Sequence, residues 1–359
     1  MITKIKIENF KSIQNLDLEL GRLNIFIGAN GSGKSNILEG IAFASVAAQD
    51  KLDKEFFKNR GIRVTQPKFY YSAFEKEKTQ REEIKITLQK DNQNPLEFNL
   101  HNLEATQKWI KQISFDEKPF FNIGSNLAVW KEEDKTQYIE YSRDEIFGSL
   151  LNFLIYAPEN SCLRNFQDEG AIEPIGIMGE GLFKHLVEKK EILKTINENL
   201  HLLDWFDGFE IPNDLMFTEK KINIKDKYFK NTIEQFDQRS ANEGFLYLLF
   251  YFTLFISEDT PKFFAIDNID NAMNPKLGGE LIRILAKLSK EYDKQVILTT
   301  HNPAILDGLD LEDDEQRLFV ISRNKSGHTQ AIRVPNRESE ERLSTRFIRG
   351  SIGGLPKNF

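Results

Sequence analysis

Eight residues near the start of the chain have the types and spacing of a phosphate-binding loop. They follow the pattern G-x-x-x-x-G-K-[ST] from Gly28 to Ser35. In such a loop, backbone N–H groups and the start of the next helix face the phosphates of a nucleoside triphosphate. Lys34 should reach the β- and γ-phosphates, and Ser35 should ligate Mg²⁺. The residues that we expect to bind the nucleotide are Asn30, Gly31, Ser32, Gly33, Lys34 and Ser35.

A carboxylate on a second strand is needed to complete a magnesium site of this kind. The apolar run 263–266 ends at Asp267, which we expect to hold the metal together with Ser35. The next residue is Asn268, whose amide can orient a water molecule but cannot accept its proton. We therefore place Asp267 and Asn268 in the catalytic centre, with Asp270 as an alternative proton acceptor.

A further candidate for this centre is His301, which directly follows the apolar run 295–300. Neighbouring strands of a parallel sheet end at the same edge, so His301 should come close to Asp267 and touch the γ-phosphate. The other four histidines are scattered through the chain and show no metal-ligand spacing. Their spacing argues against a zinc site.

The elements that position these residues are legible at both ends of the chain. Apolar residues at 23–27 predict a strand before the phosphate-binding loop, and residues 35–48 predict the helix after it. Towards the other end, residues 245–256 predict an apolar helix and residues 318–334 predict a hairpin. This β-α-β alternation at the two ends predicts one α/β nucleotide domain built from both of them.

The least regular part of the sequence lies between these ends. We expect an N-terminal lobe with the phosphate-binding loop (1–102), a lid or dimerisation insert (103–240) and a C-terminal lobe (241–359). Alternating apolar residues at 2–20 predict two half-buried strands in the first lobe. Helical periodicity appears in the insert over 182–200.

Composition limits the class of protein. Of 359 residues, 40% are hydrophobic and 29% are charged, which is typical of a soluble globular protein. The longest apolar run, 245–256, is shorter than the ~20 residues of a membrane span, so we expect no membrane association. The single cysteine, Cys162, suits a reducing cytoplasm. A net charge of −7 disfavours non-specific binding of nucleic acid, although it allows a local basic face.

Three segments, together with the phosphate-binding loop, resemble the ATPase heads of the RecF, SMC, Rad50 and OLD class of ABC-type ATPases. They are the opening strand at 2–13, the stretch 265–275 and the segment 299–303. The resemblance covers residues 1–50 and 240–310 well. It implies an α/β head of the ABC/SMC type, in which a mixed sheet with antiparallel N-terminal strands carries a mainly helical insert. It also implies ATP and Mg²⁺ as ligands.

Heads of this class close face to face over two ATP molecules, so the resemblance implies a homodimer or a higher homo-oligomer. A Ser-Gly pair at a helix start then caps the γ-phosphate held by the other subunit. The matching stretch here carries Asn242 and Gly244, and a plain helix cap is an equal interpretation. The class also uses a glutamine that senses Mg²⁺, for which Gln66 is the nearest candidate.

The sequence also departs from the class in three respects. Most members have a glutamate where this chain has Asn268, so we expect slow hydrolysis. OLD enzymes carry a Toprim nuclease domain of ~100 residues after the head. The chain continues for fewer residues than that after His301, so we expect no such domain. Sustained heptads are missing from 103–240, so we expect no coiled-coil arm.

The compact size and the Asp-Asn-Ile-Asp-Asn variant at 267–271 resemble bacterial anti-phage defence ATPases of the Septu type. Those ATPases act with a separate H-N-H nuclease. The resemblance therefore implies a subunit that gates a partner effector, expected to be a nuclease, when ATP binds. One alternative is a DNA-stimulated ATPase of the RecF/OLD type in DNA repair or recombination, with Asp270 or His301 activating water. A transporter ATPase subunit is the second alternative.

Two basic stretches are candidates for contact with nucleic acid or with a partner protein. Lysines and two aromatic residues alternate in the first, as in surfaces that follow a phosphate backbone, although Glu219 and Asp226 dilute its charge. The first stretch contains Lys220, Lys221, Lys225, Lys227, Tyr228, Phe229 and Lys230. Arginines on an expected amphipathic helix form the second, which contains Arg337, Arg342, Leu343, Arg346, Phe347, Ile348 and Arg349.

Overall fold

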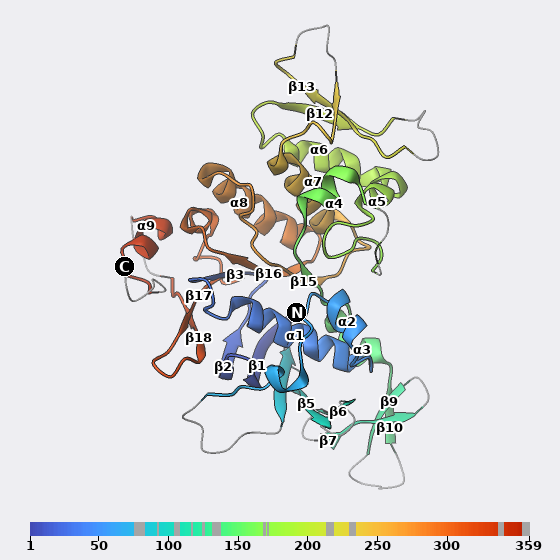
Figure 1. Ribbon diagram of the computed structural model, residues 1–359, viewed down its shortest axis with the longest axis vertical. Coiled ribbons are helices and arrows are strands. Elements are labelled where there is room, and N and C mark those ends of the chain that lie inside the picture. The colour runs from blue at the N-terminus through green and yellow to red at the C-terminus, as the bar shows by residue number, and fades with distance from the viewer. Residues whose placement is uncertain are drawn as a thin grey trace.

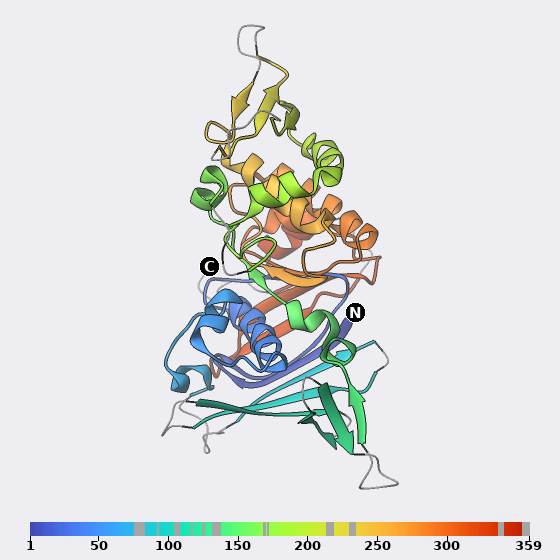
Figure 2. The same ribbon diagram turned by 90° about the vertical axis from the view of Figure 1, so that its right-hand side faces the viewer.

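Two six-stranded sheets form the body of the protein in the computed structural model (Figure 1). In the side view of Figure 2, helix α1 lies between these sheets, and helices α7 and α8 cover the outer face of the upper sheet. The site described below lies where the upper sheet meets α1. The structure describes residues 1–74, 83–91, 93–103, 108–115, 118–123, 126–130, 138–167, 170, 172–212, 219–229, 235–336 and 341–353.

The upper sheet is parallel except for its last strand, and we call it the central sheet. In spatial order its strands are β11 (Ile155–Tyr156), β15 (Phe263–Ile266), β16 (Gln295–Thr300), β3 (Leu23–Ile27), β17 (Gln316–Arg323) and β18 (Thr329–Arg333). Strands β11, β15, β16 and β3 are short and buried at every residue, because helices and the second sheet cover both faces there, whereas the last two strands are more polar and partly exposed. The expected strands at 23–27 and 295–300 and the expected hairpin are thereby confirmed.

The second sheet is antiparallel, as predicted for the N-terminal strands. Apolar and polar side chains alternate along these strands, so that Ile5, Ile7 and Leu18 face the core while the residues between them face outwards. In spatial order its strands are β2 (Ile13–Glu19), β1 (Ile2–Phe10), β4 (Ile84–Lys90), β5 (Leu96–Leu103), β6 (Lys108–Phe115) and β7 (Lys118–Pro119).

Two helices determine where the core lies. Helix α1 (Lys34–Ala48) is buried nearly all round because it lies between the two sheets. Helix α7 (Glu243–Ile256) is buried at every residue from Phe245 to Ile256, on the other face of the central sheet. A helix that is apolar all round has to be enclosed in this way. The remaining helices are α2 (Lys54–Asn59), α3 (Arg143–Phe147), α4 (Asn160–Asn165), α5 (Leu182–Glu188), α6 (Leu193–Leu200), α8 (Pro275–Glu291) and α9 (Leu343–Ile348).

The expectation of a mainly helical insert over 103–240 is wrong. Strand β6 pairs with β5 in the antiparallel sheet, and β11 forms one edge of the central sheet, so the segment is also part of the two lobes. Two small sheets lie in it as well, with the orders β10 (Tyr138–Tyr141), β9 (Asn126–Trp130), β8 (Phe121–Ile123) and β12 (Phe206–Glu210), β13 (Asn223–Asp226), β14 (Phe236–Asp237).

The helical periodicity over 182–200 belongs to two helices, α5 and α6, with a 3-10 turn between them. Lys189 leaves the helical conformation at this break. No helix in the described part of the chain is long and apolar enough to cross a membrane.

Candidate nucleotide-binding site

The phosphate-binding loop leaves the central sheet at the end of β3 and turns directly into α1. Two glycines allow this path. A Cβ on Gly28 would lie 2.1 Å from the carbonyl oxygen of Ile321, and one on Gly33 would lie 2.0 Å from Oγ1 of Thr329. Gly33 also has a φ of 108°, a backbone conformation that residues with a side chain rarely adopt. The loop is therefore packed tightly against β17 and β18.

Lys34 is buried at the first turn of α1 and its ammonium group turns back to the loop. Nζ donates to the carbonyl oxygens of Gly28 at 2.8 Å and Ala29 at 3.2 Å, and lies 3.2 Å from Nδ1 of His301. Burial lowers the pKa of Lys34 to about 8, while Asp267 and Asp270 oppose this shift. A cation that has lost much of its hydration gains strongly from an anionic ligand.

Asp267 joins the loop to the strand beside it, as the sequence predicts. Ser35 donates from Oγ to Asp267 Oδ2 at 2.9 Å. Thr299, at the end of β16, donates its hydroxyl to Asp267 Oδ1. A hydroxyl and a carboxylate in direct contact at the start of a helix provide two oxygen ligands of the kind that Mg²⁺ prefers. Thr299 was not among the expected site residues, because a threonine in an apolar strand has no distinctive signal.

Asn268 follows Asp267 in a turn at the edge of the sheet. Its φ is 57°, a conformation that asparagine tolerates better than most residues, and its N–H donates to Thr299 Oγ1 at 2.9 Å. Two residues later, Oδ1 of Asp270 is buried and has no hydrogen-bond partner among the described residues. Asn268, which could orient water, and Asp270, the alternative proton acceptor, therefore both lie on the loop that begins at Asp267.

His301 also lies at this edge, as expected, and remains exposed to solvent. Its Nδ1 is 3.0 Å from the carbonyl oxygen of Gly28, so it can donate to that oxygen or accept from Lys34, depending on the tautomer. The ring nitrogen that faces the loop is partly desolvated although the residue as a whole is exposed, and this desolvation and the nearby Lys34 cation both lower the pKa of His301. This shift favours the neutral imidazole, which can both donate and accept a hydrogen bond.

The residues at this edge fit a Mg-nucleotide. Ser32 Oγ is buried without a hydrogen-bond partner in the described part of the chain, and a buried hydroxyl normally has one. Lys34 supplies a desolvated cation, and the first turn of the 15-residue helix α1 supplies backbone N–H groups. Ser35 and Asp267 supply the oxygen ligands. Asn30 and Gly31 are exposed at the tip of the loop.

The signature-like stretch lies at the start of α7. Asn242 is exposed and caps the helix, accepting from the N–H of Phe245 at 2.9 Å. A Cβ on Gly244 would lie 3.4 Å from the carbonyl oxygen of Ala272, so this helix start touches the loop that follows Asp267. Arg164, which the sequence did not mark as a site residue, fixes the stretch by donating to the carbonyl oxygens of Arg239 and Ala241.

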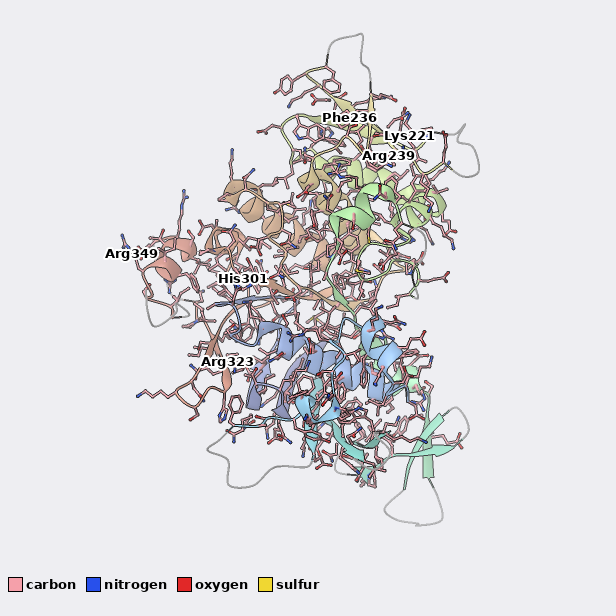
Figure 3. All side chains as sticks on the ribbon, viewed as in Figure 1. Lys221, Phe236, Arg239, His301, Arg323 and Arg349 are labelled. Atoms are coloured by element: carbon pink, nitrogen blue, oxygen red, sulfur yellow. The ribbon has the colours of Figure 1, made fainter. Side chains whose placement is uncertain are left out.

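The other candidates lie outside this site. Gln66 is exposed at the start of the 3-10 turn Pro67–Tyr70. Figure 3 places Lys221 at the top of the molecule and Arg349 at its outer side, both away from His301. Lys225 pairs with Glu210, and Lys220 donates to the carbonyl oxygen of Phe166. Lys230 and Arg337 lie outside the described residues.

In sequence, this chain is similar to the DNA replication and repair protein RecF of several bacteria. It is 37% identical to the DNA replication and repair protein RecF of Glaesserella parasuis serovar 5 (strain SH0165) over 93 residues, 26% of this chain and 24% of that protein. It is 27% identical to RecF of Clostridium tetani (strain Massachusetts / E88) over 233 residues, 62% of each. The chain thus spans less than two thirds of the length of these two relatives. RecF of Thermoanaerobacter sp. (strain X514) is 19% identical over 354 residues, 94% of this chain and 95% of that protein.

Solved structures of SMC heads share the fold. An SMC head bound to the C-winged helix domain of ScpA aligns with a TM-score of 0.58 and 14% identity, over 93% of this chain and 97% of that one. The SMC head domain from Thermotoga maritima aligns with a TM-score of 0.53 and 15% identity, over 93% and 99%.

The family model described as "AAA domain, putative AbiEii toxin, Type IV TA system" matches residues 23–307, which include the phosphate-binding loop, Asp267 and His301. The chain therefore belongs to this AAA-domain family and has the fold of the RecF/SMC-class ABC-type ATPase heads.

Proposed function

We propose that the protein binds Mg-ATP at the carboxyl edge of the central sheet and acts as an ATP-gated head that controls a partner effector. The observation that carries the binding step is the contact of Asp267 with Ser35 of the loop and with Thr299. Three segments far apart in the sequence meet there. Such a meeting is what a metal-assisted phosphate site requires.

Each residue at this edge has a separate task in the proposal. The loop amides and Lys34 bind the phosphates, and Ser35 with Asp267 holds the metal. Bound Mg²⁺ would supply positive charge that neutralises the phosphate oxygens. His301 hydrogen-bonds as a neutral imidazole near Lys34, and Asn268 orients water without accepting its proton.

Slow hydrolysis follows from Asn268. A proton acceptor commonly contributes ~10²- to 10⁴-fold to a rate. Asn268→Glu should therefore raise phosphate release by about 100-fold, even though glutamate adopts a positive φ less readily than asparagine. Asn268→Gln is the matched control, since it has the length of glutamate and no basic group. Equal rates for the two variants would show that Asn268 is not at the water-activating position.

Head-to-head dimerisation is the second part of the proposal. It is supported by the exposed start of α7, where Asn242 and Gly244 are accessible to another copy. Asn242→Asp keeps a good helix cap and adds a negative charge that would repel a phosphate held by the partner subunit. Light scattering with Mg-ATP should show dimers of the natural protein and monomers of this variant. Dimers formed equally by both would remove Asn242 from the interface.

We propose that the effector is a separate nuclease, of the H-N-H type, in a cytoplasmic anti-phage defence complex. The toxin-antitoxin description of the family and the single cysteine are compatible with this role. Purification of the tagged protein from its host, followed by mass spectrometry, should identify a nuclease in stoichiometric amount. Loss of phage resistance in Lys34→Ala cells would link that partner to ATP binding, and unchanged resistance would contradict the link.

The alternative is a DNA-stimulated ATPase in repair or recombination, which the RecF relatives favour. Phosphate release measured with and without duplex DNA separates the two functions. Stimulation to roughly 1 s⁻¹ or faster, an ordinary enzyme rate, would support the alternative and overturn the gated-subunit proposal.

A further inference from the structure

The hairpin formed by β17 and β18 contacts the phosphate-binding loop from the side opposite Asp267. Thr329 is the first residue of β18, is buried, and donates from Oγ1 to the carbonyl oxygen of Ser32 at 3.0 Å. Its own N–H donates to the carbonyl oxygen of Ser12 at 2.7 Å, which fixes its backbone. We propose that Thr329 is a positioning residue for nucleotide binding, acting through the peptide bond between Ser32 and Gly33.

The hydroxyl of Thr329 belongs to a chain of hydrogen bonds whose direction is determined. The guanidinium of Arg63 can only donate, and it donates to Asn36 Oδ1 at 2.7 Å, which fixes the orientation of that amide. The amide nitrogen of Asn36 then donates to Ser12 Oγ at 2.6 Å. Ser12 in turn lies 2.7 Å from Thr329 Oγ1.

Only one proton arrangement satisfies this chain. Since Thr329 gives its proton to the Ser32 carbonyl oxygen, Ser12 must give its own proton to Thr329. Each hydroxyl therefore accepts once and donates once. Hydrogen bonds arranged in this way polarise one another, so the bond to Ser32 is strengthened by the members behind it.

A peptide bond is planar and trans, so its C=O and N–H point in opposite directions. By holding the carbonyl of Ser32 towards the hairpin, Thr329 turns the N–H of Gly33 away from the hairpin. That N–H is one of the donors at the start of α1. The tight approach of Thr329 also explains why residue 33 is glycine, since a Cβ there would collide with the threonine hydroxyl.

A second contact from the same hairpin holds the carbonyl group of the preceding loop residue. Arg323, labelled in Figure 3, donates from Nε to the carbonyl oxygen of Gly31 at 2.7 Å. Thr329 and Arg323 lie on paired positions of β18 and β17, so the hairpin contacts the loop as one unit. It therefore holds two successive loop carbonyls, those of Gly31 and Ser32.

The test compares three hairpin variants, and it rests in part on the proposed ATP binding. Thr329→Val keeps the shape of the side chain and removes its donor, whereas Thr329→Ser keeps the donor. Ser322→Ala is the matched control, because Ser322 lies on the same hairpin and its hydroxyl bonds only to the side chain of Gln330 among the described residues. Calorimetry with Mg-ATP should show about tenfold weaker binding for Thr329→Val, and binding within about twofold of the natural protein for the other two.

A second measurement works without nucleotide. Hydrogen exchange of the peptide that covers residues 28–35 should become about tenfold faster in Thr329→Val and stay unchanged in Ser322→Ala. Faster loop exchange in a protein that never bound ATP would support the positioning role and refute the proposed function. Natural ATP affinity and natural loop exchange in folded Thr329→Val would overturn the inference. A lower unfolding temperature with both readouts unchanged would assign Thr329 a purely structural role.

Discussion

The two edges of the central sheet differ in how their buried polar groups are satisfied. At the amino edge, where the strands begin, polar side chains bond to the backbone and to one another. At the carboxyl edge, where the strands end, the hydroxyl of Ser32 and one carboxylate oxygen of Asp270 are buried and have no hydrogen-bond partner among the described residues. Burial of a polar group costs free energy unless it is paired. The first edge is therefore a structural joint, and the second is arranged for a ligand.

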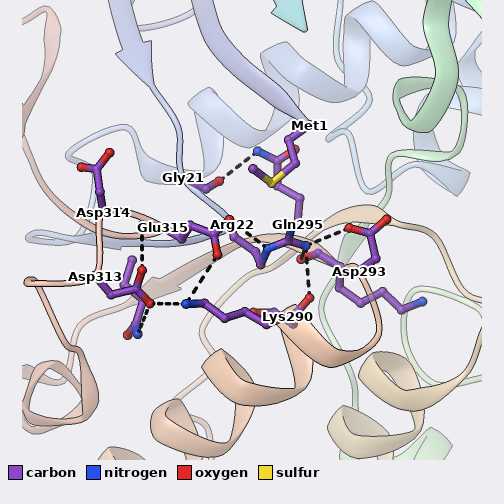
Figure 4. A network of polar contacts seen from close by, with 12 residues as sticks. Met1, Gly21, Arg22, Lys290, Asp293, Gln295, Asp313, Asp314 and Glu315 are labelled. Atoms are coloured by element: carbon purple, nitrogen blue, oxygen red, sulfur yellow. Dashed lines mark hydrogen bonds and ion pairs between the residues drawn. The ribbon is translucent and has the colours of Figure 1, made fainter. Parts of the chain in front are cut away.

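The amino edge is shown in Figure 4. Gln295, at the start of β16, accepts from the N–H of Ile2 at 2.9 Å and donates to the carbonyl oxygens of Ile2 and Gly21 at 2.7 and 2.9 Å. Arg22 bonds to Asp293 and Glu315 beside it. These contacts fasten β1 of the antiparallel sheet to the central sheet.

Two buried lysines make the same contrast. Lys294 at the amino edge donates to the carbonyl oxygens of Ser257 and Thr260 at the end of α7, and burial lowers its pKa to about 7. Nearby carboxylates oppose the shift at both lysines, but Lys34 at the carboxyl edge, with a pKa near 8, also lies 3.2 Å from His301 and bonds to the phosphate-binding loop. A lowered lysine pKa alone does not identify a functional site. The neighbouring groups do.

Removal of Gln295 should have the largest effect, and that effect should be on stability. Gln295→Leu removes three buried hydrogen bonds, although the carbonyl oxygen of Gly21 keeps its bond from Asn24, so the free energy of unfolding should fall by about 3 kcal/mol. Urea unfolding measures this loss, with Gln330→Leu as a half-buried control that should cost less than about 1 kcal/mol. The folded fraction of Gln295→Leu should bind Mg-ATP normally. Weakened binding at unchanged stability would reverse our assignment of the two edges.

Asp267→Asn is the corresponding change at the carboxyl edge. It keeps the size of the side chain and removes the charge that faces Ser35 and Thr299, so Mg-ATP should bind about 30-fold more weakly. In the presence of EDTA, the variant and the natural protein should bind ATP about equally well, because the carboxylate of Asp267 is proposed to act on the metal. Asp293→Asn at the amino edge serves as the control. An effect of equal size with and without Mg²⁺ would remove Asp267 from the metal site.

A smaller effect should come from pH. Well below pH 8 Lys34 is mostly protonated, so affinity for ATP should depend little on the charge of this lysine. Above that value the free protein loses the proton that the phosphates need, and affinity should fall up to about tenfold per pH unit. Lys34→Arg, which stays charged, should abolish the fall, whereas Lys294→Met should retain it. A fall that disappears in Lys294→Met would mean that the amino edge controls binding.

The sequence predicted the carboxyl edge better than the rest of the molecule. The phosphate-binding loop has a distinctive eight-residue pattern. Asp267 and His301 each follow an apolar run, so both the strands and the positions of these two residues could be predicted. Thr329 and Arg164 could not, because their contacts cross long stretches of chain and a single hydroxyl or guanidinium carries no pattern. Strand β6 was not predicted within the expected helical insert, although exposed and half-buried residues alternate over its first five positions.

The most direct test of the account is a calorimetric titration of Mg-ATP into the natural protein and into Lys34→Ala at pH 7. We predict saturable binding to the natural protein and at least about 100-fold weaker binding to the variant, as for the loss of a charged partner. The unfolding temperature without nucleotide should be preserved in the variant. The account would be contradicted if the natural protein released no heat with Mg-ATP, or if both proteins bound it equally well.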